Sequence, residues 1–210
     1  MNTVIVFSPH PDDLQIAMGG TALKRIAQNT RVIEVIFSAG QKSNPHLREE
    51  VIIGKRKKQA IRASRIMNIT ENIFLNLGDL NLKEEVHRVD NELLALLKKH
   101  HPTTIYIPSL NDRHPDHQAV SAKILELTQH QNIEILGYDV WGADDKRYPR
   151  TYIDISPYFR QKLRLLKIFL ETEWFSIYLQ FFPIIFRAIR NGRKIHCRYA
   201  ERFYIIKEKK

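Results

Sequence analysis

The sequence of 210 residues contains one cysteine, Cys197, and lacks an apolar run long enough to cross a bilayer. With one cysteine the chain cannot close an internal disulfide or build a zinc site from several thiolates. The stretch at residues 4–7 lacks the charged and longer apolar regions of a secretory signal, so we expect a cytoplasmic protein. With 43% hydrophobic and 27% charged residues, we expect a single domain over residues 1–210 that buries a core without disulfides.

Most of the chain also lacks an excess of charge of either sign. Residues 1–157 hold 20 Lys and Arg against 19 Asp and Glu, whereas residues 158–210 hold 13 against 4. The formal net charge of +10 is therefore concentrated in the last quarter. A nucleic-acid-binding domain usually spreads basic residues more widely, so we expect no nucleic-acid partner. The pattern favours either a local anion-facing surface or a solvated helical face.

Short runs rich in Val, Ile, Phe and Tyr alternate with longer helical patterns. Several runs are apolar on both faces, as the strands of a buried parallel sheet are. The alternation predicts an α/β layered fold with a mostly parallel sheet, and no repeat or linker divides the chain. We expect strands at 4–8, 32–38, 73–77, 104–108, 133–140 and 152–155, and helices at 18–28, 48–67, 84–100, 115–130 and 157–171.

Two polar clusters directly follow the first and fourth expected strands. Open α/β sheets bind ligands at the carboxyl ends of their strands. Each cluster pairs imidazole with carboxylate, and two histidines with one carboxylate form a common catalytic zinc set. An aspartate at a helix start can instead cap the helix, but two such clusters favour a metal site. The clusters are Ser8-Pro9-His10-Pro11-Asp12-Asp13, followed by Met18-Gly19-Gly20-Thr21, and Asn111-Asp112-Arg113-His114-Pro115-Asp116-His117.

These motifs resemble the LmbE-like family, the relatives of the zinc-dependent N-acetylglucosaminyl-phosphatidylinositol de-N-acetylase (PIG-L). The resemblance implies a three-layer Rossmann-like fold. It also implies a zinc-dependent hydrolase that removes an N-acetyl group from an amino sugar of the N-acetylglucosamine type, or from its conjugate. Further similar segments are Phe37-Ser38-Ala39-Gly40, Leu77-Gly78-Asp79, Ile153-Asp154-Ile155-Ser156 with Lys162, and Tyr199-Ala200-Glu201-Arg202-Phe203.

The resemblance also implies roles for individual residues. Asp12 would be the general base that takes a proton from the zinc-activated water. His114 would stabilise the oxyanion or protonate the leaving amine, with Asp116 orienting its ring. A set of two histidines and one carboxylate suits Zn²⁺ and also Fe²⁺. The implied metal ligands are His10, Asp13 and His117.

Two further residues occupy positions where relatives contact the sugar, Arg56 and Asp79. A charged helix face explains Arg56 equally well. The chain departs from the family pattern at Gln15, where an acidic residue is common, and we interpret this as drift within the family. The alternatives are a catalytically silent member that binds a saccharide or a membrane surface, and an amidase of a non-sugar acyl amine.

The segment at about 172–198 is rich in aromatic residues and carries basic residues toward its end. Pro183 predicts a kink or an end in any helix there. The segment could lie in a membrane interface, pack on the sheet, form a homo-oligomer contact or bind a soluble phosphorylated sugar. We expect a small amino-sugar substrate. The sequence leaves open whether it is anionic or lipid-linked, and whether the protein lies peripherally on the inner face of the membrane.

Overall fold

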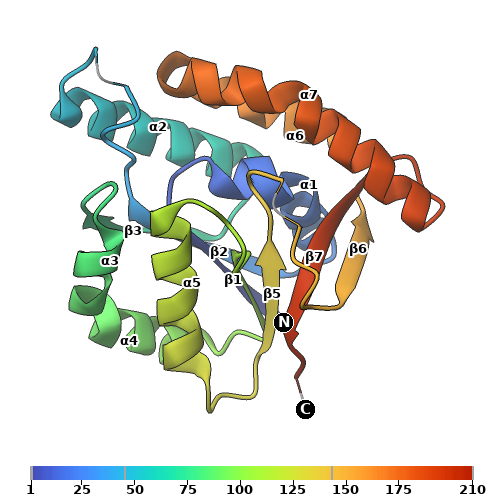
Figure 1. Ribbon diagram of the computed structural model, residues 1–210, viewed down its shortest axis with the longest axis horizontal. Helices are drawn as coiled ribbons and strands as arrows, with labels where there is room; N and C mark the ends of the chain where they lie inside the picture. Colours follow the sequence, from blue (N-terminus) through green and yellow to red (C-terminus); the bar gives the residue numbers. More distant parts are fainter. Residues whose placement is uncertain (1, 45, 143, 210) are drawn as a thin grey trace.

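The computed structural model describes residues 2–44, 46–142 and 144–209, which form a seven-stranded sheet with helices on both faces (Figure 1). The strand order is β3-β2-β1-β4-β5-β7-β6. Strands β1 to β5 are parallel, and β7 runs antiparallel between β5 and β6, which confirms the predicted α/β class. The strands are β1 (Thr3–Ser8), β2 (Arg31–Ser38), β3 (Glu71–Leu77), β4 (Thr104–Pro108), β5 (Glu134–Tyr138), β6 (Arg150–Asp154) and β7 (Ala200–Lys207).

Two helical layers bury both faces of this sheet. In β1, Val4 and Val6 pack toward α1, α2, α6 and α7, whereas Ile5 and Phe7 pack toward α3, α4 and α5. This alternation of side chains explains why the strand is an unbroken apolar run. The helices are α1 (Asp13–Ala27), α2 (Glu49–Met67), α3 (Leu82–Glu85), α4 (Asp90–His100), α5 (Pro115–Thr128), α6 (Phe159–Leu166) and α7 (Leu170–Lys194), with 3₁₀ turns η1 (Val86–Val89) and η2 (Lys167–Phe169).

Several predicted element bounds are wrong. Strand β7 was not predicted, because charged residues stand near its start. The helix expected over 84–100 is divided into α3, η1 and α4, and the one expected over 157–171 ends at Leu166 before η2 and α7. Helix α7 continues through Pro183, which is exposed, so the carbonyl group left without a backbone partner can face water. Among the described residues, none of the helices is long and apolar enough to cross a membrane.

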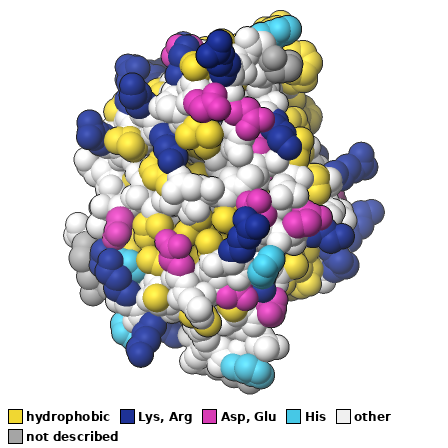
Figure 2. Space-filling view, turned by 90° about the vertical axis from the view of Figure 1, so that its left-hand side faces the viewer, with side chains coloured by type: hydrophobic (Ala, Val, Ile, Leu, Met, Phe, Trp, Pro, Cys, Tyr) yellow, Lys and Arg dark blue, Asp and Glu magenta, His cyan; other side chains and the backbone are white. Residues whose placement is uncertain are grey.

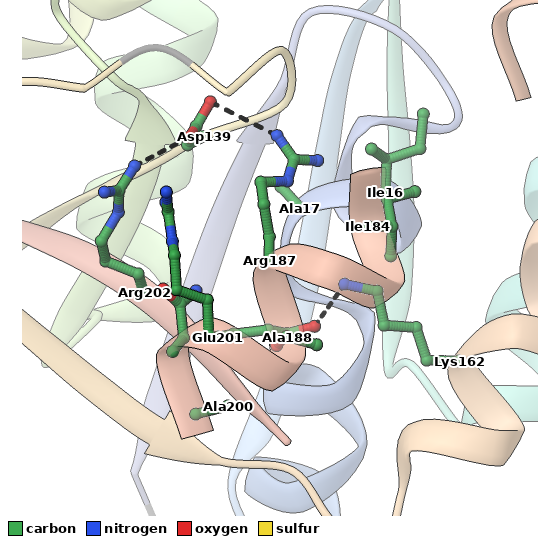
Figure 3. A pocket seen from close by; sticks show the side chains of 12 residues that line it. Ile16, Ala17, Asp139, Lys162, Ile184, Arg187, Ala188, Ala200, Glu201 and Arg202 are labelled. Atoms are coloured by element: carbon green, nitrogen blue, oxygen red, sulfur yellow. Dashed lines mark hydrogen bonds and ion pairs between the residues drawn. The ribbon is translucent and has the colours of Figure 1, made fainter. Parts of the chain in front are cut away.

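Helix α1 is held in place by a buried carboxylate from β7. Met18 has non-helical φ and ψ angles and separates the first turn of α1 from the remainder. Glu201 caps the remainder, accepting hydrogen bonds from the backbone N–H groups of Gly20 (3.1 Å) and Thr21 (2.7 Å). The ammonium group of Lys162 lies 2.6 Å from the same carboxylate (Figure 3). These contacts anchor the part of α1 that follows Met18 to β7 and α6.

We expect Gly20→Ala to destabilise the protein and Gly54→Ala to stabilise it. A Cβ atom at position 20 would lie 2.7 Å from Cδ1 of the buried Ile155, whereas one at position 54 meets no atom within 4 Å. Overpacking costs about 1–3 kcal/mol, and replacing a helical glycine with alanine gains about 0.5–1 kcal/mol. Thermal unfolding should therefore show a lower Tm for Gly20→Ala and a slightly higher one for Gly54→Ala. Equal midpoints would contradict this packing.

Candidate metal centre and active site

The two polar clusters meet where the strand order reverses. Strand β1 lies between β2 and β4, and ligands of open α/β sheets bind outside the carboxyl ends of strands at such a point. His10 follows β1, and His114 and His117 follow β4. The ring centroids of His10 and His114 are 5.0 Å apart, and those of His10 and His117 are 5.6 Å apart. The chain thus brings together residues more than a hundred positions apart.

Three side chains form a donor set that fits a divalent metal ion. Asp13 Oδ2 lies 3.5 Å from His10 Nδ1 and 3.5 Å from His117 Nε2. The three donor atoms lie within 4.8 Å of one another. Ligands about 2.0–2.2 Å from a tetrahedral ion are about 3.3–3.6 Å from each other. The spacing and chemistry of His10, Asp13 and His117 therefore suit Zn²⁺ or Fe²⁺.

Each histidine of this set faces a carboxylate through its other ring nitrogen. His117 Nδ1 lies 3.0 Å from Asp112 Oδ2, and His10 Nε2 lies 3.3 Å from both Asp79 Oδ1 and Asp116 Oδ2. Carboxylates in such positions fix the orientation of a ligating ring and raise its basicity. The sequence analysis did not assign Asp112 a role. Its place five residues before His117, within the second cluster, is the local signal that could have identified it.

A second group of potential donors consists of His10, His114 and Asp116. It fits an ion less well, because the carboxylate of Asp116 already accepts the backbone N–H groups of Leu80 (2.8 Å) and Leu82 (3.2 Å). That carboxylate lies against His10. The ring of His114 is held instead by the backbone N–H of Asp116, which donates to Nδ1 at 3.2 Å. The contact between Asp116 and the ring of His114 is thus made by the main chain of Asp116.

The electrostatics of the site favour a bound cation. Burial alone lowers the pKa of His10, but nearby carboxylates, Asp116 foremost, raise it well above its usual value. Burial alone raises the pKa of Asp13, but His117 and His10 lower it to about 2. Burial, followed by the charges of His10 and His117, lowers the pKa of His114. Asp13 thus stays ionised and His114 tends to stay neutral.

A cavity of about 200 Å³ opens over the donor set. Asp12 makes no capping hydrogen bond to α1, and instead its Oδ1 atom accepts Arg56 Nη2 at 2.8 Å. Arg56 also pairs with Glu173 of α7. Asp79 Oδ2 accepts the backbone N–H of Lys42 at 2.7 Å. Both Arg56 and Asp79 line the cavity, and their contact with a sugar stays a prediction.

Local sequence patterns predict neither the position of Glu173 in the cavity nor the surroundings of the Gln15 amide. Glu173 is buried and lines the cavity, at the one position within α7 with non-helical φ and ψ angles. Its only sequence signal is an acidic side chain beside the aromatic run that begins at Trp174. Gln15 is fully buried, and its amide atoms find no hydrogen-bond partner within the described residues. The departure from the family pattern at this position therefore leaves an unsatisfied amide.

Replacing Asp112 with alanine should weaken metal binding without removing a ligand. Loss of a carboxylate that orients a ligating histidine lowers metal affinity by about 10–100-fold. A competition titration with a chelator measures this change. Asp90→Ala is the matched control, since Asp90 lies at the start of α4 and pairs with Lys123. Unchanged affinity in Asp112→Ala would show that this carboxylate does not support the ligand.

The fold and the site define an α/β protein with a candidate divalent-metal centre at the switch point of its sheet. Comparison with known families makes the assignment specific. The chain belongs to the PIG-L family, described as GlcNAc-PI de-N-acetylase, whose model matches residues 5–128.

Individual relatives agree with this assignment. The chain is 23% identical over 219 residues to the diacetylchitobiose deacetylase of Thermococcus kodakarensis, covering 94% of this chain and 80% of that protein. The solved structure of N,N′-diacetylchitobiose deacetylase from Pyrococcus horikoshii matches with a TM-score of 0.84 at 22% identity, covering 98% of this chain and 84% of that one. The 4-carboxy-2-hydroxymuconate hydratase from Pseudomonas putida matches with a TM-score of 0.83 at 16% identity, covering 99% and 97%. Since a hydratase shares the fold, the fold alone does not identify the reaction.

Proposed function

We propose that this protein is a metal-dependent hydrolase that removes the acetyl group from the amide nitrogen of an amino sugar or its conjugate. One observation carries the proposal. The donor set and a separate buried carboxylate, Asp12, line the same cavity in a chain that matches a sugar deacetylase along nearly its whole length. The scarcity of cysteine supports a cytoplasmic location, where thiols stay reduced.

The side chains that line the cavity have separate roles in amide hydrolysis. A divalent ion held by His10, Asp13 and His117 would supply Lewis acidity for the carbonyl group and a lowered pKa for water. Asp12 accepts the proton of the attacking water and delivers it to the nitrogen as the C–N bond breaks. Acetate and the free amine are the products. Arg56 holds the Asp12 carboxylate in place through the hydrogen bond that its Nη2 atom donates.

His114 is suited to stabilise the negative charge that develops on the carbonyl oxygen. Its Nδ1 atom accepts a backbone N–H, so the proton of the neutral ring resides on Nε2. A neutral imidazole that lines the cavity and carries its proton on Nε2 can donate a hydrogen bond that strengthens as the oxyanion forms. Its lowered pKa agrees with this neutral state. Arg56 and Asp79 remain as polar groups for the hydroxyls of the sugar.

Acetate release from matched amides tests the proposal. We expect the zinc-loaded protein to release acetate from N-acetylglucosamine conjugates or N,N′-diacetylchitobiose, with an equal amount of free amine. An N-acetyl amino acid is the matched non-sugar amide. Turnover of the amino acid alone would favour the amidase alternative. A fully metal-loaded protein without turnover of any of these would favour the silent binding alternative.

A further inference from the structure

One layer of helices carries the whole formal net charge of the protein. Helices α2, α6 and α7 with η2, here called the basic helical layer, hold 14 Lys and Arg against 4 Asp and Glu. The remaining residues hold 19 against 19. The three helices lie together along the upper side of Figure 1, although α2 comes from a distant part of the chain. Of the 14 cations, Arg56 and Lys162 are buried, and the others are exposed or half-buried.

One face of the molecule carries side chains of both signs of charge. Figure 2 shows the face at the left of Figure 1, where positive and negative side chains alternate around small apolar patches. The residues outside the basic helical layer are balanced in charge, so the excess of positive charge belongs to this layer. A single-sign field on one side of a molecule attracts and orients partners of the opposite sign.

Exposed apolar side chains gather on the same layer. Of fourteen large apolar side chains that are exposed in the described residues, ten lie on α2 and α7. On α7 they recur every three or four residues and form one stripe, while Ile177, Ile184 and Ala188 on the opposite side enter the core. Phe182 is 70% exposed and Phe186 is 66% exposed. The aromatic stripe consists of Trp174, Phe175, Tyr178, Leu179, Phe182 and Phe186.

Cations follow the aromatic stripe at one end, and others lie on the helix that contacts its other end. Exposed Arg190, Arg193 and Lys194 continue α7 beyond Phe186. Helix α2 contacts the start of α7 and carries three more exposed cations, Lys58, Arg62 and Arg65. The stripe extends about 18 Å at 1.5 Å per residue. Aromatic and aliphatic side chains on one face with cations at the border are typical of helices that lie in the interface of an anionic membrane.

The cavity over the donor set reaches this stripe. A second hollow of about 220 Å³ is lined by Trp174 and Phe175 and by the loop after β2. It shares Ser43, Glu173 and Ser176 with the cavity over the donor set. The path from the candidate site to the surface therefore emerges at the amino-terminal end of the aromatic stripe.

We propose that the basic helical layer docks the protein on an anionic lipid surface, with the aromatic stripe of α7 in the headgroup region. Charge complementarity selects this occupant. A two-fold contact between copies through this layer would bring the same cations face to face, which is repulsive. The exposed apolar side chains include aliphatic Leu179 and Ile61, which suit a lipid surface. A nucleic-acid partner is disfavoured, because bases stack on aromatic side chains rather than on aliphatic ones.

Vesicle sedimentation tests the proposal directly. We expect the protein to sediment with phosphatidylglycerol-containing vesicles. Its partition coefficient for vesicles of pure phosphatidylcholine should be lower by about tenfold or more. Phe182→Ser with Phe186→Ser should lower the partition coefficient about tenfold or more, and Leu94→Ser on α4 is the matched control. Arg190→Gln with Arg193→Gln should lower it about fivefold per residue, against Lys83→Gln with Lys98→Gln on α3 and α4. Equal binding to both vesicles, or undiminished binding of the α7 variants, would overturn the proposal.

Tryptophan fluorescence locates the contact. The chain has two tryptophans, so Trp141→Phe leaves Trp174 as the only emitter. Its emission should shift to the blue with phosphatidylglycerol vesicles and be quenched by brominated lipid. A dimer that the Phe182 and Phe186 changes dissociate, without vesicle binding, would instead identify an interface between copies. Those changes should leave acetate release from a soluble substrate at the wild-type rate, so a failure of docking is separable from a failure of the deacetylase proposal.

Discussion

Asp12→Asn should abolish most acetate release while the protein keeps its metal. Asparagine preserves the size of the side chain and can still face Arg56, but it cannot accept the proton of the attacking water. General acid–base catalysis contributes about 10²–10⁴-fold to a rate, and we expect kcat to fall within that range. Steady-state kinetics on a soluble acetylated sugar measures this loss, and elemental analysis of the same preparation measures the metal.

A control variant distinguishes loss of the general base from a general effect of removing one negative charge. Glu84→Gln removes an exposed carboxylate on α3 and should leave kcat unchanged. Metal content should be equal in the Asp12→Asn, Glu84→Gln and wild-type proteins, because the donor set does not include Asp12. Full activity of Asp12→Asn would show that another group is the base. Loss of the metal in this variant would show that Asp12 belongs to the ligand set.

His117→Ala should reduce the metal content from about one ion per chain to a small fraction. The change removes one of three donors and leaves the buried carboxylate of Asp112 without its imidazole partner. Because a bound ion stabilises only the folded state, a chelator should lower the Tm of the wild type. The same chelator should leave the Tm of His117→Ala nearly unchanged. His87→Ala, an exposed histidine on η1, is the matched control and should keep its metal.

Retention of a full equivalent of metal by His117→Ala would contradict the assigned donor set. The second group, His10, His114 and Asp116, would then be the better candidate. His114→Ala distinguishes the two groups. In our account this variant keeps the metal and loses turnover, because His114 acts on the substrate oxygen.

Local patterns were sufficient to predict the parallel part of the sheet. Strands β1 to β5 are short runs rich in apolar residues that alternate with helical patterns, and burial on both faces makes the central run of β1 continuous. Strand β7 was missed because Glu201 and Arg202 interrupt its apolar pattern. Their charges are satisfied by long-range partners, Lys162 for Glu201 and Asp139 for Arg202. The sequence alone does not indicate such partners.

The candidate site could likewise be predicted only in part from the sequence. His10 and Asp13 lie in one motif, and His114 and His117 in another, so spacing along the chain could predict that each pair converges. The contact of Glu173 with Arg56 joins α7 to α2, and no spacing predicts it. The distribution of charge could also be predicted only in part. Counting along the chain located an excess of Lys and Arg in the last quarter. Only the fold brings α2 into contact with α7 and completes the basic helical layer.

The most direct test of the account is a titration of the chelated protein with Zn²⁺, in which bound metal and acetate release from an N-acetylated amino sugar are measured together. The account predicts that the rate rises in proportion to bound metal and levels off at about one ion per chain. Acetate release without bound metal, or none from a protein that holds one full equivalent, would contradict it.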